Sequence, residues 1–234
     1  MRIACLHTIE SNIEPFEAAA RELGDAGLTL RHEVRDDLLA AVGRAGSLDA
    51  TVMAETVAVL RALAADSDGV LLTCSTLGPA VVPAQRHCPV PVLRVDQGLA
   101  REAVKEGGKA IVLYTAPTTL ASTQQLFEAE ARATGAVIEV RRVPDAWDDF
   151  KAGGLDRYYQ RTAEAADRAF REGVKTVVLA QVSMAPAAAL CREGRPLVSP
   201  ATGLKAAVLA AETASGSAIP TVRSPVSTAA RRRS

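Results

Sequence analysis

Short apolar runs alternate along the chain with longer segments in which apolar residues recur every three or four positions. The short runs have strand length and end at glycine, proline or small polar residues, whereas the longer segments have helical periodicity. We predict strands over residues 2–6, 29–34, 69–73, 91–95, 110–114, 137–143, 176–179 and 196–198. We predict helices over residues 14–23, 96–106, 120–134, 155–171 and 202–212, and a long helix that Ser47 caps and that ends near residue 65. This alternation is typical of an α/β fold with mostly parallel sheets.

The pattern occurs twice along the chain. Residues 69–80 align without a gap with residues 176–187, and Pro186 lies 107 positions after Pro79. Residues 3–8 align with residues 111–116 at nearly the same offset, and a helical segment ending in a glycine follows both copies. Two matches in register predict two similar α/β halves.

The repeat also suggests where the halves divide. We assign residues 1–97 and 203–214 to the first half, because the last helix is expected to pack back on it, and residues 98–202 to the second half. Residues 144–154 are expected to be irregular, and there Trp147 either forms part of a lid or fills a surface groove. Ser, Ala, Pro and Thr predominate from residue 215 on, so residues 215–234 are predicted to be a disordered tail.

Composition excludes some functions. The chain has 234 residues, of which 48% are hydrophobic and 23% are charged, which is typical of a globular protein. Lys and Arg together number 27, as do Asp and Glu, so no net basic charge indicates nucleic acid or an anionic membrane as a partner. The chain enters a strand at once, without a signal-like segment or a bilayer-length apolar run, so we expect a cytoplasmic protein.

The four cysteines give no zinc-binding pattern. Cys5, Cys74, Cys88 and Cys191 form no C-x-x-C pair and lack histidines at zinc-site spacing, so we predict no metal site. Nucleotide-binding glycine motifs and the G-x-S-x-G nucleophile motif are also absent from the sequence.

Cys74 is the candidate for chemistry. It directly follows the apolar run of residues 69–72 and stands among the hydroxyls of Thr73, Ser75 and Thr76, before a Gly-Pro pair. Ligands bind at the carboxyl ends of strands in open α/β sheets, and the hydroxyls and main-chain N–H groups of this turn could hold a carboxylate or an oxyanion beside the sulfur. The alternative is that Cys74 is a small buried hydrophobic residue, as free cysteines commonly are.

The duplicated halves, the Thr-Cys-Ser-Thr-Leu-Gly-Pro turn of residues 73–79 and the Thr115-x-x-Thr118 loop together resemble the aspartate/glutamate racemase superfamily. That superfamily includes amino-acid and hydantoin racemases, maleate isomerase and arylmalonate decarboxylase. The resemblance covers about residues 1 to 212. It implies two Rossmann-like halves related by a pseudo-twofold axis, an active site in the cleft between them, no cofactor, and a homodimer that acts on a small carboxylate substrate.

The resemblance implies a role for several residues. Cys74 matches the first of the two cysteines that racemases of this family place on opposite faces of the substrate. The substrate-binding positions are implied at Thr8, Asn12, Ser75, Thr76, Thr115, Thr118, Gln181 and Val182. The hydroxyl of Thr118 and the side chain of Asn12 could instead cap the helices that follow them.

The chain departs from the family at the second cysteine, where Gln181 stands. A thiol can be tuned to exchange a proton near neutral pH, whereas a carboxamide cannot. His7 and Ser183 are the candidates for the missing acid or base, and His7 could equally be a hydrogen-bonded loop residue.

Three functions remain open from the sequence. The first is a cofactor-independent racemase or other isomerase acting at the α-carbon of a small, amino-acid-like carboxylate, with Cys74 as acid and base. The second is a decarboxylase, a lyase or a covalent-thiol cis-trans isomerase acting on a malonate-like or maleate-like acid. The third is a non-catalytic two-lobed protein that binds a small acid.

Overall fold

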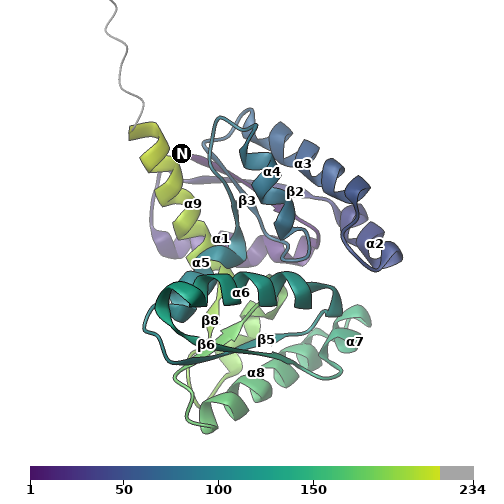
Figure 1. Ribbon diagram of the computed structural model, residues 1–234, viewed down its shortest axis with the longest axis vertical. Coiled ribbons are helices and arrows are strands. Elements are labelled where there is room, and N and C mark those ends of the chain that lie inside the picture. The colour runs from purple at the N-terminus through teal and green to yellow at the C-terminus, as the bar shows by residue number, and fades with distance from the viewer. Residues whose placement is uncertain (217–234) are drawn as a thin grey trace, which may run out of the picture.

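The computed structural model describes residues 1–216, which form two four-stranded parallel sheets with helices packed on both (Figure 1). The first sheet has the strand order β2 (Thr29–Val34), β1 (Arg2–His7), β3 (Gly69–Leu72), β4 (Val92–Arg94). The second has the order β6 (Val137–Arg142), β5 (Lys109–Tyr114), β7 (Thr176–Leu179), β8 (Leu197–Val198). The same order recurs in each half, which confirms the predicted fold of two similar parallel α/β halves.

Nine α-helices and four 3-10 segments connect the strands within residues 1–216. The helices are α1 (Ile13–Leu23), α2 (Asp36–Ala45), α3 (Ala50–Ala64), α4 (Val81–Gln85), α5 (Val95–Val104), α6 (Leu120–Thr134), α7 (Ala146–Lys151), α8 (Leu155–Arg171) and α9 (Ser199–Gly216). The 3-10 segments are η1 (Glu10–Asn12), η2 (Gly78–Ala80), η3 (Pro117–Thr119) and η4 (Val182–Leu190). No helix among the described residues combines the length and the apolar character needed to cross a membrane.

The structure differs from the predicted elements at four places. Asp49, rather than Ser47, caps α3, because its carboxylate accepts a 2.9 Å hydrogen bond from the backbone N–H of Val52. Residues 36–45, which had no predicted element, form α2 and bury Leu38 and Val42. The segment predicted to be irregular contains α7, a six-residue helix. Of the predicted tail, residues 215 and 216 belong to α9, and residues 217–234 lie outside the described part of the chain.

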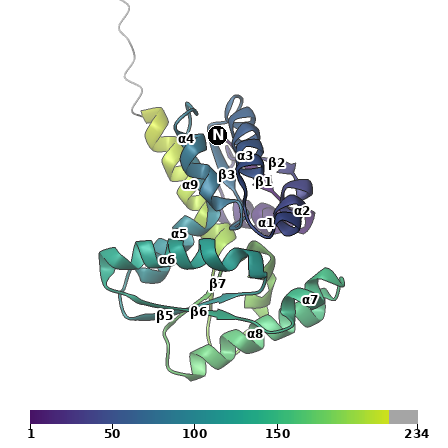
Figure 2. The same cartoon turned by 45° about the vertical axis from the view of Figure 1, so that its right-hand side comes forward.

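The central strands are buried because both faces of each sheet carry helices. Ile3, Cys5, Leu71 and their neighbours in β1 and β3 are fully buried, as expected for central parallel strands. The last helix, α9, lies beside the first sheet in both views (Figures 1 and 2), although the second half precedes it in the chain. Helix α6 lies along the boundary between the halves in the same views, so its first turn is close to the loops that leave the first sheet.

Close packing of α9 on α5 depends on a glycine. A Cβ atom at Gly203 would lie 2.6 Å from Cγ2 and 2.9 Å from the backbone oxygen of Val95. One of these contacts is with backbone, so the two helices would have to move apart to admit a methyl group.

We therefore expect Gly203→Ala to lower the free energy of unfolding by about 1–3 kcal/mol, the usual cost of overpacking a core. The matched control is Gly43→Ala in α2, where a Cβ would meet no atom within 4 Å. That change should be neutral or raise stability by up to about 1 kcal/mol, because alanine favours the helix over glycine. Urea denaturation of both variants measures the difference, and equal effects would contradict the packing role of Gly203.

Candidate functional site

A cavity lies where the carboxyl ends of the central strands of the two halves face each other. The first half contributes Thr8, Ile9, Asn12, Leu39, Thr73, Cys74, Ser75 and Thr76 to its lining. The second half contributes Ala116, Thr118, Thr119, Trp147, Gln181, Val182 and Ser183. None of these lining residues has a charged side chain, so an acidic ligand would be held by neutral N–H and O–H donors.

Cys74 lies two residues beyond the end of β3 and is 8% exposed. Burial raises the pKa of its thiol above the ordinary value. Four groups oppose that effect because they can hydrogen-bond to a thiolate: the hydroxyls of Thr8 and Thr76 and the backbone N–H groups of Thr76 and Leu77. Cys74 is therefore mainly a protonated thiol at neutral pH, placed among donors that stabilise its anion.

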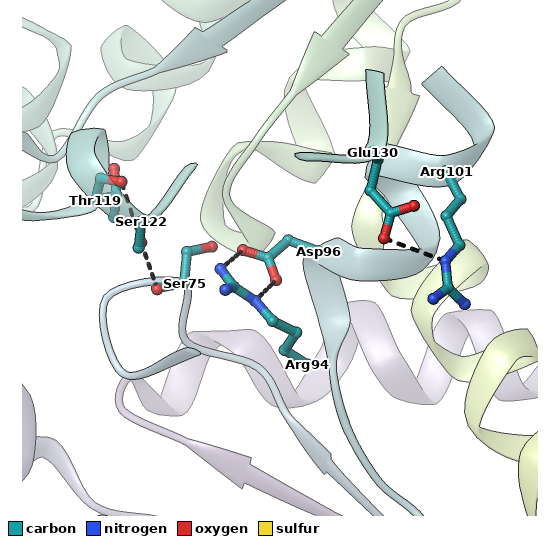
Figure 3. Close-up of polar contacts among 7 residues, drawn as sticks. All are labelled: Ser75, Arg94, Asp96, Arg101, Thr119, Ser122 and Glu130. Atoms are coloured by element: carbon teal, nitrogen blue, oxygen red, sulfur yellow. Dashed lines mark hydrogen bonds and ion pairs between the residues drawn. The ribbon is translucent and has the colours of Figure 1, made fainter. Parts of the chain in front are cut away.

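The loop that carries Cys74 is held in place by Arg94 of the first half and by hydrogen bonds from the second half. The guanidinium of Arg94 forms two hydrogen bonds, of 2.6 and 2.8 Å, with the buried carboxylate of Asp96 (Figure 3). It packs against Gly78 so closely that a Cβ there would lie 2.5 Å from its central carbon. The Gly-Pro pair that the sequence places after Cys74 thus provides room for an arginine.

Two hydrogen bonds connect this loop to the second half. The hydroxyl of Ser122, in α6, donates to the backbone oxygen of Ser75 at 2.6 Å and to that of Thr119 at 3.2 Å (Figure 3). The hydroxyls of Thr76 and Thr118 lie 3.3 Å apart. The two loops predicted to bind substrate, one from each half, are therefore in direct contact.

Gln181 is held in one orientation by its carbonyl oxygen. Oε1 accepts hydrogen bonds from the backbone N–H groups of Thr115, at 2.6 Å, and Ala116, at 3.0 Å. It also accepts a 2.8 Å hydrogen bond from the Thr115 hydroxyl. With the oxygen occupied, the amide group of this cavity-lining residue offers N–H donors to a ligand.

Thr115 itself does not line the cavity. Its side chain is fully buried and positions Gln181, so the structure does not support the predicted direct contact between Thr115 and substrate.

Ser183 lines the cavity and is backed by a buried tyrosine. The hydroxyl of Tyr158, from α8, lies 2.9 Å from Oγ of Ser183 and 3.3 Å from Oγ1 of Thr115. Since Thr115 donates its hydrogen to Gln181, it cannot donate to Tyr158, and the single hydrogen of Tyr158 goes either to Thr115 or to Ser183, which is the closer oxygen. Burial raises the pKa of Tyr158 to about 12, so its hydroxyl is protonated and can donate to Ser183.

His7 does not reach the cavity, although the sequence made it a candidate acid or base. Its ring is fully buried, with Nδ1 2.9 Å from Oγ1 of Thr73 and Nε2 2.8 Å from Nδ1 of His32. Burial, with a smaller contribution from His32, lowers the pKa of His7 to about 3. His7 therefore cannot supply a proton near neutral pH, and Ser183 is the candidate that the structure places at the cavity.

Tyr158, which lies behind the lining, and Trp147, which belongs to it, were not predicted as site residues. Tyr158 was part of a predicted helix, and nothing in its periodicity indicates that its hydroxyl meets Ser183. Trp147 lines the cavity from α7, stacked on Phe150 with ring centroids 5.1 Å apart. Asn12 is where the sequence placed it, and its buried Oδ1 has no hydrogen-bond partner within residues 1–216.

The thiolate-stabilising role of Thr8 can be tested directly. We expect Thr8→Val to slow alkylation of Cys74 at pH 8 by about tenfold, because a hydrogen bond to a charged group contributes about 1.5–3 kcal/mol and a tenfold loss of thiolate is one pKa unit. Mass spectrometry of the Cys74 peptide after timed exposure to iodoacetamide measures the rate. Thr51→Val, on an exposed face of α3, is the control, and equal rates in the two variants would contradict the contact.

Residues 15–214 match the family described as Asp/Glu/Hydantoin racemase. No curated protein matches the sequence.

Among solved structures, the Picrophilus torridus aspartate racemase is 12% identical with a TM-score of 0.69, and the alignment covers 92% of this chain and 94% of that one. An aspartate racemase homologue from Pyrococcus horikoshii is 14% identical with a TM-score of 0.62, covering 90% and 99%. The allantoin racemase from Klebsiella pneumoniae is 18% identical with a TM-score of 0.60, covering 92% and 86%. The family match spans most of the chain, and the protein belongs to the Asp/Glu/hydantoin racemase family.

Proposed function

We propose that the protein is a cofactor-independent isomerase that inverts the α-carbon of a small, amino-acid-like carboxylate, with Cys74 as an acid and base. Family membership supports the isomerase class. The observation that carries the proposal is the position of Cys74 in a cavity shared by both halves, with four hydrogen-bond donors around its sulfur.

The neutral donors of the lining would hold the carboxylate. Ser75, Thr76 and Thr118 bring hydroxyl groups, and the amide of Gln181 points its N–H donors away from the occupied oxygen. A developing enolate carries negative charge on the same oxygens, so donors fixed in a water-poor site stabilise it more than the ground state. Thr115 assists by orienting Gln181.

The unpaired oxygen of Asn12 would favour an amino-acid-like substrate if the side chain turned it toward the cavity that the residue lines. Oδ1 accepts no hydrogen bond from residues 1–216, and leaving such an atom unpaired costs about 1–3 kcal/mol. An α-ammonium group or a ring N–H would satisfy it. Ionised malonates and maleate offer only acceptors at that position, so they match this atom less well.

The proton transfers follow from the two sides of the cavity. The thiolate, which is the minor form of Cys74 at neutral pH, takes the α-proton, so the C–H bond breaks, the S–H bond forms and the electron pair enters the enolate. Ser183 comes from the other half, and its O–H gives a proton to the opposite face of the carbon. The Tyr158 hydroxyl, 2.9 Å from Ser183, replaces that proton and becomes a phenolate, so the enzyme is left with a Cys74 thiol and a Tyr158 anion, the state from which the reverse reaction starts. The reverse reaction uses the same groups in the opposite order.

A second function has one observation in its favour. Because burial raises its pKa, Cys74 rests mainly as a thiol and is ready to donate a proton. A decarboxylase acting on a malonate-like acid needs such a donor, to protonate the enolate that remains after carbon dioxide leaves.

Chiral chromatography tests the first proposal and separates it from the second. The purified protein is incubated with single enantiomers of aspartate, glutamate and 5-substituted hydantoins, and in parallel with maleate and arylmalonates. We expect inversion of one of the amino-acid-like compounds, lost at least about 1,000-fold in Cys74→Ala and kept in Cys88→Ala. Carbon dioxide release or olefin isomerisation without any inversion would contradict the racemase proposal and support the alternative.

The role of Ser183 and Tyr158 can be separated from that of Cys74. General acid catalysis contributes about 10²- to 10⁴-fold, so Ser183→Ala should slow inversion by that order. Tyr158→Phe keeps the ring in the core but removes the hydroxyl, and it should slow inversion less. Both variants should retain exchange of the α-hydrogen with solvent through Cys74. Equal loss of exchange and inversion would contradict a hydroxyl donor on the opposite face.

A further inference from the structure

A group of metal-binding side chains lies in the first half, outside the cavity lining. Cys5 and His7 stand two residues apart on β1, so they share one face of the sheet, and His32 is the register partner of Cys5 on β2. Their ligand atoms all lie within 4.8 Å of one another. Cys5 and His7 are fully buried, and Glu17 of α1 contacts the group through a hydrogen bond with His32.

Hydrogen bonds determine which nitrogen of each ring carries a proton. The Thr73 hydroxyl lies 3.0 Å from the backbone oxygen of Leu6 and 2.9 Å from Nδ1 of His7, and when it donates its single hydrogen to Leu6 it accepts from Nδ1–H of His7. The carboxylate of Glu17 accepts from Nε2–H of His32 at 2.9 Å. In this tautomer Nδ1 of His7, which faces Thr73, and Nε2 of His32, which faces Glu17, are both donors, and we call them the outer nitrogens.

The two inner nitrogens then face each other with lone pairs. Nε2 of His7 and Nδ1 of His32 are 2.8 Å apart, and Sγ of Cys5 is beside them. Two lone pairs at this distance repel, so in this tautomer a positive centre has to lie between them. A proton can serve, and so can a metal ion that also takes the sulfur.

We propose that Cys5, His7 and His32 bind a divalent cation of the zinc class, with Glu17 and Thr73 orienting the two imidazoles. One thiolate and two neutral imidazoles are ligands that zinc prefers. Metal-bound histidines almost always donate their second N–H to a carboxylate or another acceptor, as both rings do in this group. The ligand set leaves a fourth position for a water molecule.

The ion fits the space and the charge of the group. With Zn–N distances of about 2.0–2.1 Å and a tetrahedral angle, the inner nitrogens would be about 3.3 Å apart, so the rings must separate by about half an ångström. His32 belongs to an edge strand and is partly exposed, so its ring can make this adjustment. The thiolate of Cys5 and the carboxylate of Glu17 balance the two charges of the ion, and binding releases the thiol proton and the proton between the rings.

The site would support the loop of Cys74 without taking part in its chemistry. Nδ1 of His7 is hydrogen-bonded to Thr73, the residue before Cys74, so the ion would fix the end of β3. The inference does not rest on the proposed activity, and metal binding measures it without any substrate.

Cobalt substitution tests the site. Co²⁺ is added to the full chain after treatment with a chelator, and absorption is recorded. We expect one equivalent to bind, with d–d bands of a tetrahedral ion and a near-ultraviolet thiolate-to-cobalt band that zinc abolishes. Cys5→Ser should remove the thiolate band, whereas Cys74→Ser and Cys88→Ser should keep it. Absence of these bands in the wild-type chain, or their loss in Cys74→Ser rather than Cys5→Ser, would overturn the proposal.

Variants of Glu17 and His32 keep the test valid if Cys5→Ser does not fold. Glu17→Gln should weaken metal binding by about 10- to 100-fold, the usual effect of changing an outer partner of a metal-bound histidine. Glu22→Gln, on the same helix and exposed, should have no effect. His32→Gln should abolish binding while circular dichroism stays unchanged. Wild-type metal affinity in both Glu17→Gln and His32→Gln would show that the ion binds elsewhere in the protein and would overturn the proposal.

Discussion

The contact between the loops that follow β3 and β5 determines the rest of the site. Each loop leaves the carboxyl end of a central parallel strand, so the fold directs both toward the space between the halves. The Ser122–Ser75 and Thr76–Thr118 hydrogen bonds hold them together there, and Arg94 supports the first loop from below. The sulfur of Cys74 consequently lies away from bulk water yet close to several donors.

The duplication repeats the scaffold without repeating the chemistry. Cys74 and Gln181 follow equivalent strands, yet the first carries an ionisable thiol and the second an amide whose oxygen is fully occupied. Ser183 and Tyr158 provide hydroxyl groups on the Gln181 side. A site of this kind has an ionisable thiol on one face and a weaker, hydroxyl-based donor on the other.

The sequence predicted what depends on local pattern. Apolar runs, glycine-ended helices and the repeat around Cys74 were enough for the two halves, and the resemblance to the racemase superfamily implied most of the polar residues of the lining. Contacts between side chains that are distant in sequence could not be predicted, because they depend on how the elements pack. Tyr158 meets Ser183 from another helix, and Thr115 turns from the cavity to hold Gln181. The ring of His7 contacts His32. The group that these two residues form with Cys5 has no zinc-site spacing in the sequence, because its members come from two neighbouring strands.

Proton NMR in D₂O tests the central claim, that the sulfur of Cys74 moves the α-proton of the substrate. Wild type and Cys74→Ala are compared on the panel of amino acids and hydantoins, with the intensity of the α-proton signal followed over time. The claim predicts that the wild-type protein exchanges the α-proton of one compound for deuterium and that Cys74→Ala leaves the signal intact. Exchange at the same rate in both proteins would contradict it.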